Sequence, residues 1–132
     1  MKHSPYDVAS VFRGRVTQPL SVGLASARWL SLVEGLDLDE AQVHWYETQD
    51  PVATLARPVE SLGLGRPVLL GEFPTRGASL SATDILHVAR AAGYSAALAW
   101  SALADDHATD PRACRLALCR WSGRPAPDVR QA

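Results

Sequence analysis

Four short apolar runs recur along the chain, and segments with helical periodicity separate them. The runs are PLSVGL (19–24), AQVHWY (41–46), RPVLLGEF (66–73) and YSAALAWSAL (94–103). We interpret these strands as apolar on both faces, which is typical of strands covered on both sides. Regular alternation of such strands with helices predicts βαβ units and therefore an α/β domain with a parallel sheet.

Helical patterns fill the spaces between these runs and flank them. They are SARWLSLVEGL (26–36), DPVATLARPVESLGLG (50–65), SATDILHVARAAG (81–93), DVASVFRGR (7–15) and DPRACRLALCRW (110–121). Beyond them the chain becomes polar and rich in proline. We therefore expect one domain over residues 1–122 and a frayed tail over residues 123–132.

Local residues mark where these helices begin and end. Ser26 and Asp50 stand at helix starts as expected caps, and Pro51 occupies a first-turn position that tolerates proline. Pro58 lies inside the 50–65 segment and should kink or split it. Gly93 is placed to end the 81–93 helix. The order of elements does not decide whether the sheet stays open and doubly wound or forms part of an eightfold barrel.

The charge balance excludes several classes of partner. The 132-residue chain has a net charge of −1, and Lys2 is its only lysine. Without a basic run, we expect neither nucleic acid nor an acidic membrane surface as a partner. No apolar stretch approaches 18 residues, and the first residues lack a signal-peptide core. The default expectation is a cytoplasmic chain, although a longer parent chain could be secreted.

Cysteine and histidine spacing gives no metal or redox motif. Cys114 and Cys119 stand five residues apart in an expected helix, on different faces, so we expect free thiols. The histidines show no metal-ligand spacing: they are His3, His44, His87 and His107. GLGRP (63–67) lacks the pattern of a phosphate-binding loop, and no Gly-x-Ser-x-Gly elbow occurs. We therefore expect no cofactor and no serine-hydrolase site.

Polar and aromatic residues gather where the predicted strands end. The carboxyl ends of parallel strands carry the chemistry in such folds, and here they hold His44, Trp45, Tyr46, Glu72, Trp100 and Ser101. A carboxylate among aromatic rings suits a sugar, because rings stack on pyranose faces and a carboxylate stabilises an anomeric centre. Taken singly, each residue has a structural interpretation. Together, on three successive strands, they favour a site.

Four motifs in order resemble one enzyme family. GRPVLLGEFP (65–74) resembles the penultimate barrel strand of the cellulase-like enzymes of glycoside hydrolase family five, in which a Gly-Glu pair carries the nucleophile. VHWYE (43–47) is similar to that family's preceding strand, and GYSAALAWSALADD (93–106) is similar to its final strand. PLSVGLASARWL (19–30) resembles the strand before those.

The resemblance implies a role for each matching residue. Glu72 would be the nucleophile, with the Tyr46 phenol bonding its carboxylate. His44 would contact the substrate, and Trp100 would stack beneath the sugar. A retaining mechanism would follow, in which a second carboxylic acid protonates the leaving oxygen and then activates water.

One departure limits what the resemblance implies. The family's acid/base follows an asparagine at the end of the fourth barrel strand, and this sequence contains no asparagine. Nothing in the sequence places Glu47, Asp105 or Asp106 as a substitute. A whole barrel needs about 250 residues. The matched motifs therefore predict strands five to eight of a TIM-type barrel, a retaining hydrolase-like domain for a β-glycan that is weak or inactive alone.

Two alternatives stay open at this point. A half-barrel could bind carbohydrate, or assemble with another chain, without catalysis. An unrelated flavodoxin-like domain could carry Glu72 as a solvated strand end. For a half-barrel, the inward layer would include Val22, Val43 and Leu70 if they face inward, and two sheet edges would lack partners. We therefore expect self-association through the unpaired edges.

Overall fold

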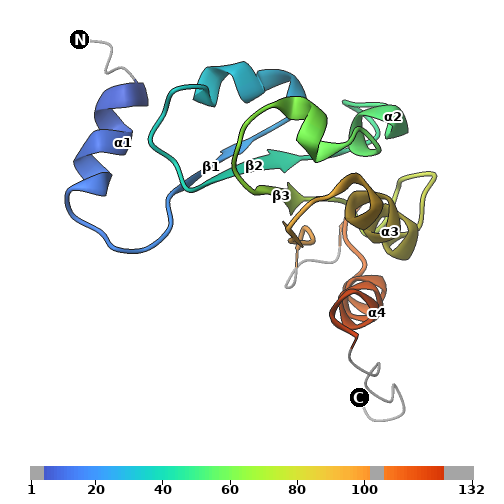
Figure 1. Ribbon diagram of the computed structural model, residues 1–132. Coiled ribbons are helices and arrows are strands. Elements are labelled where there is room, and N and C mark those ends of the chain that lie inside the picture. Colours follow the sequence, from blue (N-terminus) through green and yellow to red (C-terminus); the bar gives the residue numbers. More distant parts are fainter. Residues whose placement is uncertain (1–4, 102–105, 124–132) are drawn as a thin grey trace.

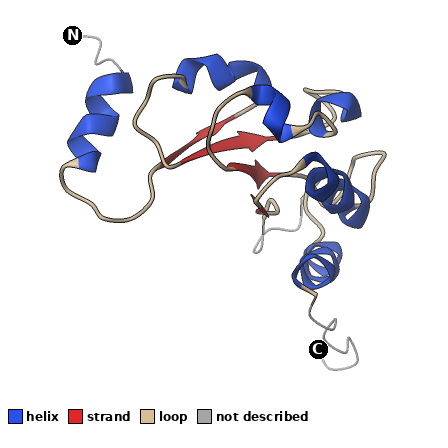
Figure 2. Cartoon of the chain, viewed as in Figure 1, coloured by secondary structure: helices blue, strands red, loops and turns tan. Residues whose placement is uncertain are grey.

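The computed structural model describes residues 5–101 and 106–123, and its elements follow the predicted alternation (Figures 1 and 2). In chain order they are α1 (Pro5–Arg13), β1 (Ser21–Leu24), the 3₁₀ helix η1 (Ala27–Val33), β2 (Glu40–His44), α2 (Val52–Leu55), the 3₁₀ helix η2 (Val59–Leu62), β3 (Val68–Glu72), α3 (Ala82–Ala92), β4 (Ala96–Ala97) and α4 (Pro111–Ser122). The predicted tail from residue 124 onward and Asp105 lie outside the described residues.

The four strands form one parallel sheet in the order β1-β2-β3-β4. A doubly wound sheet reverses its strand order at a switch point, and this sheet has no reversal. Right-handed crossovers that always step in the same direction place their helices on one face, as Figure 1 shows for the segments joining β1 to β4. The flavodoxin-like alternative is therefore wrong, and the sheet has the topology of part of a β/α barrel.

The two faces of the sheet differ in burial, which corrects the expectation of strands covered on both sides. On β2, Ala41 and Val43 are fully buried while Gln42 and His44 are only half-buried. Side chains alternate between faces along a strand, so the helices cover one face. Val43 and Leu70, considered above as inward residues, belong to the core shared with the helices.

The start of η1 follows the sequence prediction, but the start of α2 does not. Ser26 Oγ accepts a hydrogen bond from the Arg28 amide at 3.1 Å, as a cap should. Asp50 is not a cap: Pro51 takes that position, and the Asp50 side chain is buried. A buried carboxylate requires a charged or hydrogen-bonding partner. Arg28 supplies it, with its Nε 3.2 Å from Asp50 Oδ1.

The two predicted breakers act as expected. Pro58 divides the 50–65 segment into α2 and η2 and stands at the start of η2. Gly93 ends α3 in the left-handed region with φ of 93°, a conformation that favours glycine. At the other end of α3, Ser81 Oγ accepts from the Asp84 amide at 3.2 Å. α3 thus has a defined start and end.

α4 packs on α3 and extends the helical layer. Asp110 caps α4 by accepting from the Arg112 amide at 2.9 Å. Arg90 of α3 lies over the Trp121 ring, 4.4 Å from its centroid, and donates to the Trp121 carbonyl. Cys114 and Cys119 are free thiols.

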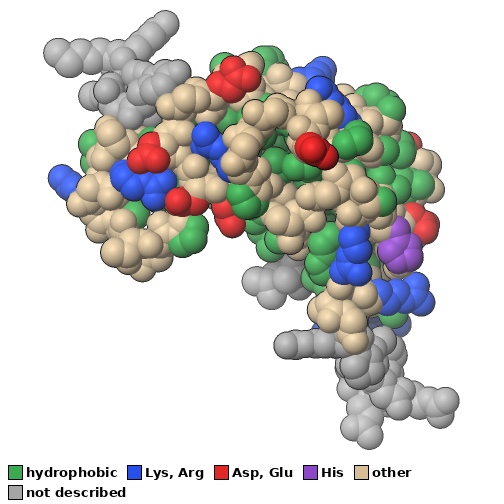
Figure 3. All heavy atoms as spheres, in the orientation of Figure 1, with side chains coloured by type: hydrophobic (Ala, Val, Ile, Leu, Met, Phe, Trp, Pro, Cys, Tyr) green, Lys and Arg blue, Asp and Glu red, His purple; other side chains and the backbone are tan. Residues whose placement is uncertain are grey.

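α1 lies at the far end of the molecule, beyond β1 (Figure 1). Arg13 ties it to the segment before β2, with Nε 3.0 Å from Asp37 Oδ2 and Nη1 2.9 Å from Asp39 Oδ2. Acidic and basic side chains are adjacent in this part of the surface (Figure 3). The Leu20 amide also donates to Asp39, and these hydrogen bonds lower the pKa of that carboxyl.

Candidate active site

The sheet brings the predicted site residues to one edge. His44 ends β2, and Tyr46 follows two residues later. Glu72 ends β3. Trp100 follows β4 and pairs through its backbone with Pro74 in an isolated parallel bridge. All of these positions are at or just beyond the carboxyl ends of their strands, where parallel folds build their sites.

An extra residue in β3 turns Glu72 toward His44. Val43 pairs with Leu70, but the next residue, His44, pairs with Glu72 rather than Gly71. Such a bulge re-aims the following side chain, and here it puts Glu72 on the same face as His44. Gly71 fits this place because a Cβ there would lie 2.2 Å from Gln42 Cγ. The glycine before the glutamate therefore has a steric role in the fold.

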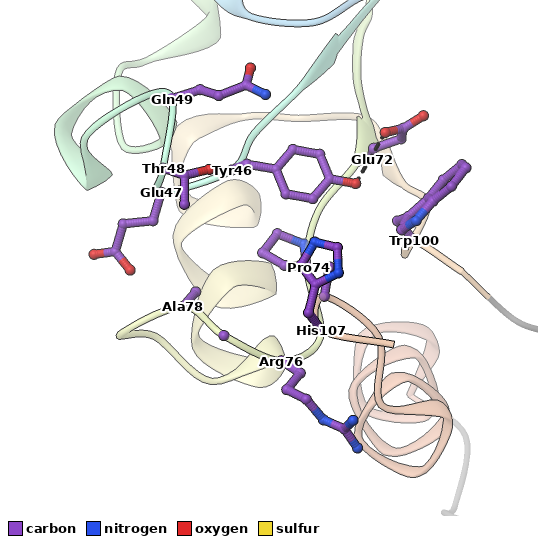
Figure 4. A pocket seen from close by; sticks show the side chains of 12 residues that line it. Tyr46, Glu47, Thr48, Gln49, Glu72, Pro74, Arg76, Ala78, Trp100 and His107 are labelled. Atoms are coloured by element: carbon purple, nitrogen blue, oxygen red, sulfur yellow. Dashed lines mark hydrogen bonds between the residues drawn. The ribbon is translucent and has the colours of Figure 1, made fainter. Parts of the chain in front are cut away.

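The Glu72 carboxylate has two partners from β2 and the residues after it. Tyr46 Oη donates to Glu72 Oε2 at 3.1 Å, the contact drawn in Figure 4. His44 Nδ1 lies 3.3 Å from the same oxygen. The expected meeting of Tyr46 with Glu72 is thus present in the structure. Glu72 is half-buried and partnered, which differs from a solvated strand end.

The local environment keeps the Tyr46 phenol protonated. Its burial raises the pKa of Tyr46 well above the usual value, and the negative charge of Glu72 and the hydrogen bond to it add to this effect. Asp106 contributes a smaller increase in the same direction. A phenol with a raised pKa stays a hydrogen-bond donor at neutral pH. Tyr46 can therefore hold the carboxylate in one orientation.

Trp100 stands beside Glu72 at a cavity of about 390 Å³ (Figure 4). This volume falls within the range of ligand-binding pockets. The Trp100 side chain remains 45% exposed, so its ring is available to a ligand. Residues 46–49, 74, 76–78 and 107–108 form the other walls. The cavity thus combines a carboxylate with an open aromatic face, the chemistry that sugar binding requires.

The structure adds Arg76 and His107, which the sequence analysis did not assign to the site. Both line the cavity from loops. Arg76 Nη1 donates to the Asp106 carbonyl at 3.1 Å, and its Nη2 lies 3.8 Å from Asp110 Oδ2. In the sequence, the one indication for these two residues was that each comes after the end of a strand. No spacing rule identifies such loop residues.

The other described carboxylates of this region do not have the properties of a general acid. Glu47 accepts from the Ser79 amide and hydroxyl, both at 2.6 Å, which lowers its pKa, and its side chain extends away from Glu72 (Figure 4). The hydrogen bond from the Ala108 amide lowers the pKa of Asp106. A carboxylic acid that donates a proton near neutral pH needs a raised pKa.

The described residues form neither a metal-binding cluster nor a helix that could span a membrane. In residues 5–101 and 106–123, no group of three or more histidine, cysteine, aspartate or glutamate side chains could hold a metal ion. No helix within the same ranges has the length and apolar character needed to cross a bilayer.

Comparison with known proteins identifies a structural neighbour. The crystal structure of an endo-1,4-beta-mannanase from Eisenia fetida superposes with a TM-score of 0.69 and 22% sequence identity, covering 88% of this chain and 38% of that one. No model of a protein family and no curated protein matches the sequence. At this identity the likeness establishes the fold alone. The chain spans 38% of the neighbour's length and has the fold of that part of it, as a half-barrel requires.

Proposed function

We propose that this chain carries the nucleophile-bearing half of a retaining, cellulase-like glycoside hydrolase of family five that acts on a β-glycan. The observation that carries the proposal is the Glu72 carboxylate, which is held by Tyr46 and His44 at a cavity bordered by Trp100. The four sequence motifs support the family, and the fold shared with a mannanase supports a glycoside hydrolase-like architecture.

Each residue has a role in the proposed reaction. A Glu72 oxygen forms a bond to the anomeric carbon while the bond from that carbon to the glycosidic oxygen breaks. Tyr46 orients the nucleophile, His44 contacts a sugar hydroxyl, and Trp100 stacks on the ring. Water then attacks the anomeric carbon, the bond from that carbon to Glu72 breaks to regenerate the carboxylate, and one proton of the water passes to solvent. The departing oxygen needs a proton, and the nearby carboxylates Glu47 and Asp106 have lowered pKa values.

The activity test uses substrates that differ in their need for an acid. We expect slow hydrolysis of an aryl β-glycoside with a good leaving group and still slower hydrolysis of a natural β-glycan. Loss of general acid help costs roughly 10² to 10⁴ in rate. Glu72→Gln should abolish the aryl glycosidase activity. Glu60→Gln removes a carboxylate from the exposed helix η2 and should leave it unchanged.

Covalent trapping tests the nucleophile directly. A fluorinated glycoside that slows hydrolysis of the glycosyl-enzyme should label Glu72, and peptide mass spectrometry would locate the label. Equal hydrolysis by the Glu72→Gln variant, or a label on another residue, would remove Glu72 from the proposed role. Efficient hydrolysis of natural glycan by the pure chain would mean that another group supplies the proton.

A non-catalytic carbohydrate-binding half-barrel is the second candidate. The lowered pKa values of Glu47 and Asp106 favour it, because a binding module needs no proton donor. In that case β-linked oligosaccharides should bind to both the wild-type chain and Glu72→Gln, and neither protein should hydrolyse them. Trp100→Ala should weaken binding, since it removes the exposed ring at the cavity. Calorimetric titration separates this candidate from the hydrolase.

A further inference from the structure

Two glycines lie in the strands on either side of β2, next to the side chains of Gln42 and His44. Gly23 lies on β1 and Gly71 on β3, one on each side of the central strand. Side chains from β2 fill both spaces. A Cβ at Gly71 would lie 2.2 Å from Gln42 Cγ, and a Cβ at Gly23 would lie 2.9 Å from Gln42 Oε1 and 3.1 Å from His44 Nε2. Gln42 and His44 therefore depend on glycine in the neighbouring strands.

His44 spans the distance between these two strands. On the β3 side its Nδ1 is 3.3 Å from Glu72 Oε2. On the β1 side its Nε2 and Cε1 face Gly23, at 3.1 and 3.7 Å from the place that a Cβ would occupy. The imidazole thus fits between a carboxylate and a bare stretch of backbone. Its position depends on both neighbours.

The backbone itself does not require glycine at position 23. Gly23 is absent from the glycines with positive φ, and it pairs in regular parallel register with Gln42. Glycine inside a strand weakens the strand, and it often marks a close approach of another group. Here the group that approaches is the imidazole of His44. Glycine at position 23 is therefore explained by the space that its missing side chain leaves for the His44 ring.

We propose that Gly23 is a positioning residue, whose missing side chain leaves the space that holds the His44 imidazole against Glu72. A role of Gly23 in catalysis rests on the proposed function. The contact between His44 and Glu72 can be measured without any reaction. In Gly23→Ala, the Gln42 amide can swing aside because it ends a flexible chain. The His44 ring has Glu72 on its other side, so it must rotate, and Nδ1 moves away from the carboxylate.

The test compares Gly23→Ala with Gly14→Ala. A Cβ at Gly14 would make only ordinary contacts, at 3.8 and 4.0 Å, with α1 carbonyl oxygens. The readout is the ¹⁵N resonance of the His44 ring nitrogens, because an acceptor at Nδ1 favours the tautomer protonated there. We expect Gly23→Ala to move the Nδ1 resonance in the same direction as Glu72→Gln does. Gly14→Ala should leave it in place.

Measuring both kcat/KM and the melting temperature distinguishes a displaced His44 from a general loss of folding. If the chain cleaves an aryl glycoside, Gly23→Ala should lower kcat/KM about 10-fold, since small misplacements in a site are costly. Its melting temperature should not fall, because alanine is a better strand residue than glycine at this exposed position. Gly14→Ala should keep the wild-type kcat/KM.

Unchanged His44 resonances in a folded Gly23→Ala protein would overturn the proposal. If that variant does not fold, Gly23→Ala combined with Gln42→Ala removes the shorter contact and leaves His44 as the obstacle. Wild-type resonances in the double variant would then also overturn it. A chain without hydrolysis, in which Gly23→Ala still displaces His44, would refute the proposed function but support the positioning role.

Discussion

The two described contacts of the Glu72 carboxylate go to the same oxygen. Tyr46 and His44 both lie within 3.3 Å of Oε2. Among the described residues, no hydrogen bond is made to Oε1. A carboxylate held at one oxygen presents the other to a ligand in a fixed direction. This arrangement suits a nucleophile, for which orientation contributes much of the rate.

The charge of Glu72 should be visible in the titration of Tyr46. Burial and that charge raise the pKa of the phenol. Glu72→Gln removes the charge, which makes the phenolate less costly, so we expect the pKa of Tyr46 to fall while staying above the usual range because of burial. An absorbance titration measures the change. Tyr94, whose pKa is raised by burial and by the charge of Asp50 rather than of Glu72, serves as an internal reference. An unchanged Tyr46 pKa would mean that burial alone determines it.

The sequence predicted part of this site because strand ends are recognisable. His44, Tyr46, Glu72 and Trp100 each lie toward the carboxyl end of an apolar run, and one topology rule places them at one edge. The bulge that turns Glu72 could not be predicted, since it depends on the register between two strands. The residues on the cavity walls at 76 and 107 come from loops, whose paths no periodicity describes. The catalytic roles of the four residues stay predictions.

At the scale of elements, α3 has a serine cap at its start and a glycine at its end. Ser81 is exposed and accepts from the Asp84 amide, and its hydroxyl lies 2.6 Å from Asp84 Oδ2. Ser81→Ala should lower the free energy of unfolding by about 1 kcal/mol, as is typical of lost caps. Ser31→Ala, at another exposed serine, is the matched control. Chemical denaturation measures both variants. Equal stability of the two would show that the Ser81 hydroxyl does not stabilise α3.

The start of α4 should be sensitive to acid. Amides of Ala113 and Arg112 donate to Asp110, and these bonds lower its pKa below the ordinary value of 3.8. A group with a lowered pKa in the folded state stabilises the fold above its unfolded pKa and loses this effect as pH falls through the folded value. We therefore expect stability to decline below about pH 4.

Asp110→Asn separates this effect from general acid unfolding. Asparagine can still cap a helix, but it does not titrate. The variant should lose part of the decline below about pH 4, measured by circular dichroism during thermal unfolding at several pH values. An identical pH dependence in the variant would assign the decline to other carboxyl groups.

The hydrophobic periodicity predicted where the elements lie better than it predicted their length or helix type. The run at 94–103 predicts a long strand, whereas β4 covers only Ala96–Ala97, because apolar residues alone do not determine which backbone groups form ladder hydrogen bonds. Likewise η1 is a 3₁₀ helix although its cap was predicted. Over seven residues, the same apolar pattern fits both helix types. The misassigned cap at Asp50 has a tertiary cause, the distant Arg28.

At the scale of the whole molecule, an apolar groove of about 520 Å³ lies between α1 and β1. Phe12 of α1, Val22 of β1 and Leu32 of η1 line it and are exposed. β1 pairs only with β2 in the described sheet, so its other edge has no described strand partner. Exposed apolar patches beside an unpaired edge are sites of association.

These features favour self-association of the isolated chain. Burial of a few hundred Å² of apolar surface contributes several kcal/mol at roughly 25 cal/mol per Å², comparable to the net stability of a domain. We therefore expect dimers or larger species at low micromolar concentration, measured by sedimentation velocity. The melting temperature should rise with protein concentration, because association stabilises the folded state.

A charge on the edge strand should prevent this association. Val22→Lys places a cation in the groove at a side chain that is 40% exposed, and lysine is a residue that natural edge strands use against pairing. Val11→Lys makes the same change at a side chain that is 52% exposed on α1 and does not line the groove. We expect Val22→Lys to sediment as a monomer and Val11→Lys to associate like the wild type. A wild-type chain that is monomeric at every concentration, with one cooperative transition at high temperature, would contradict the prediction and show that the open edge is stable alone.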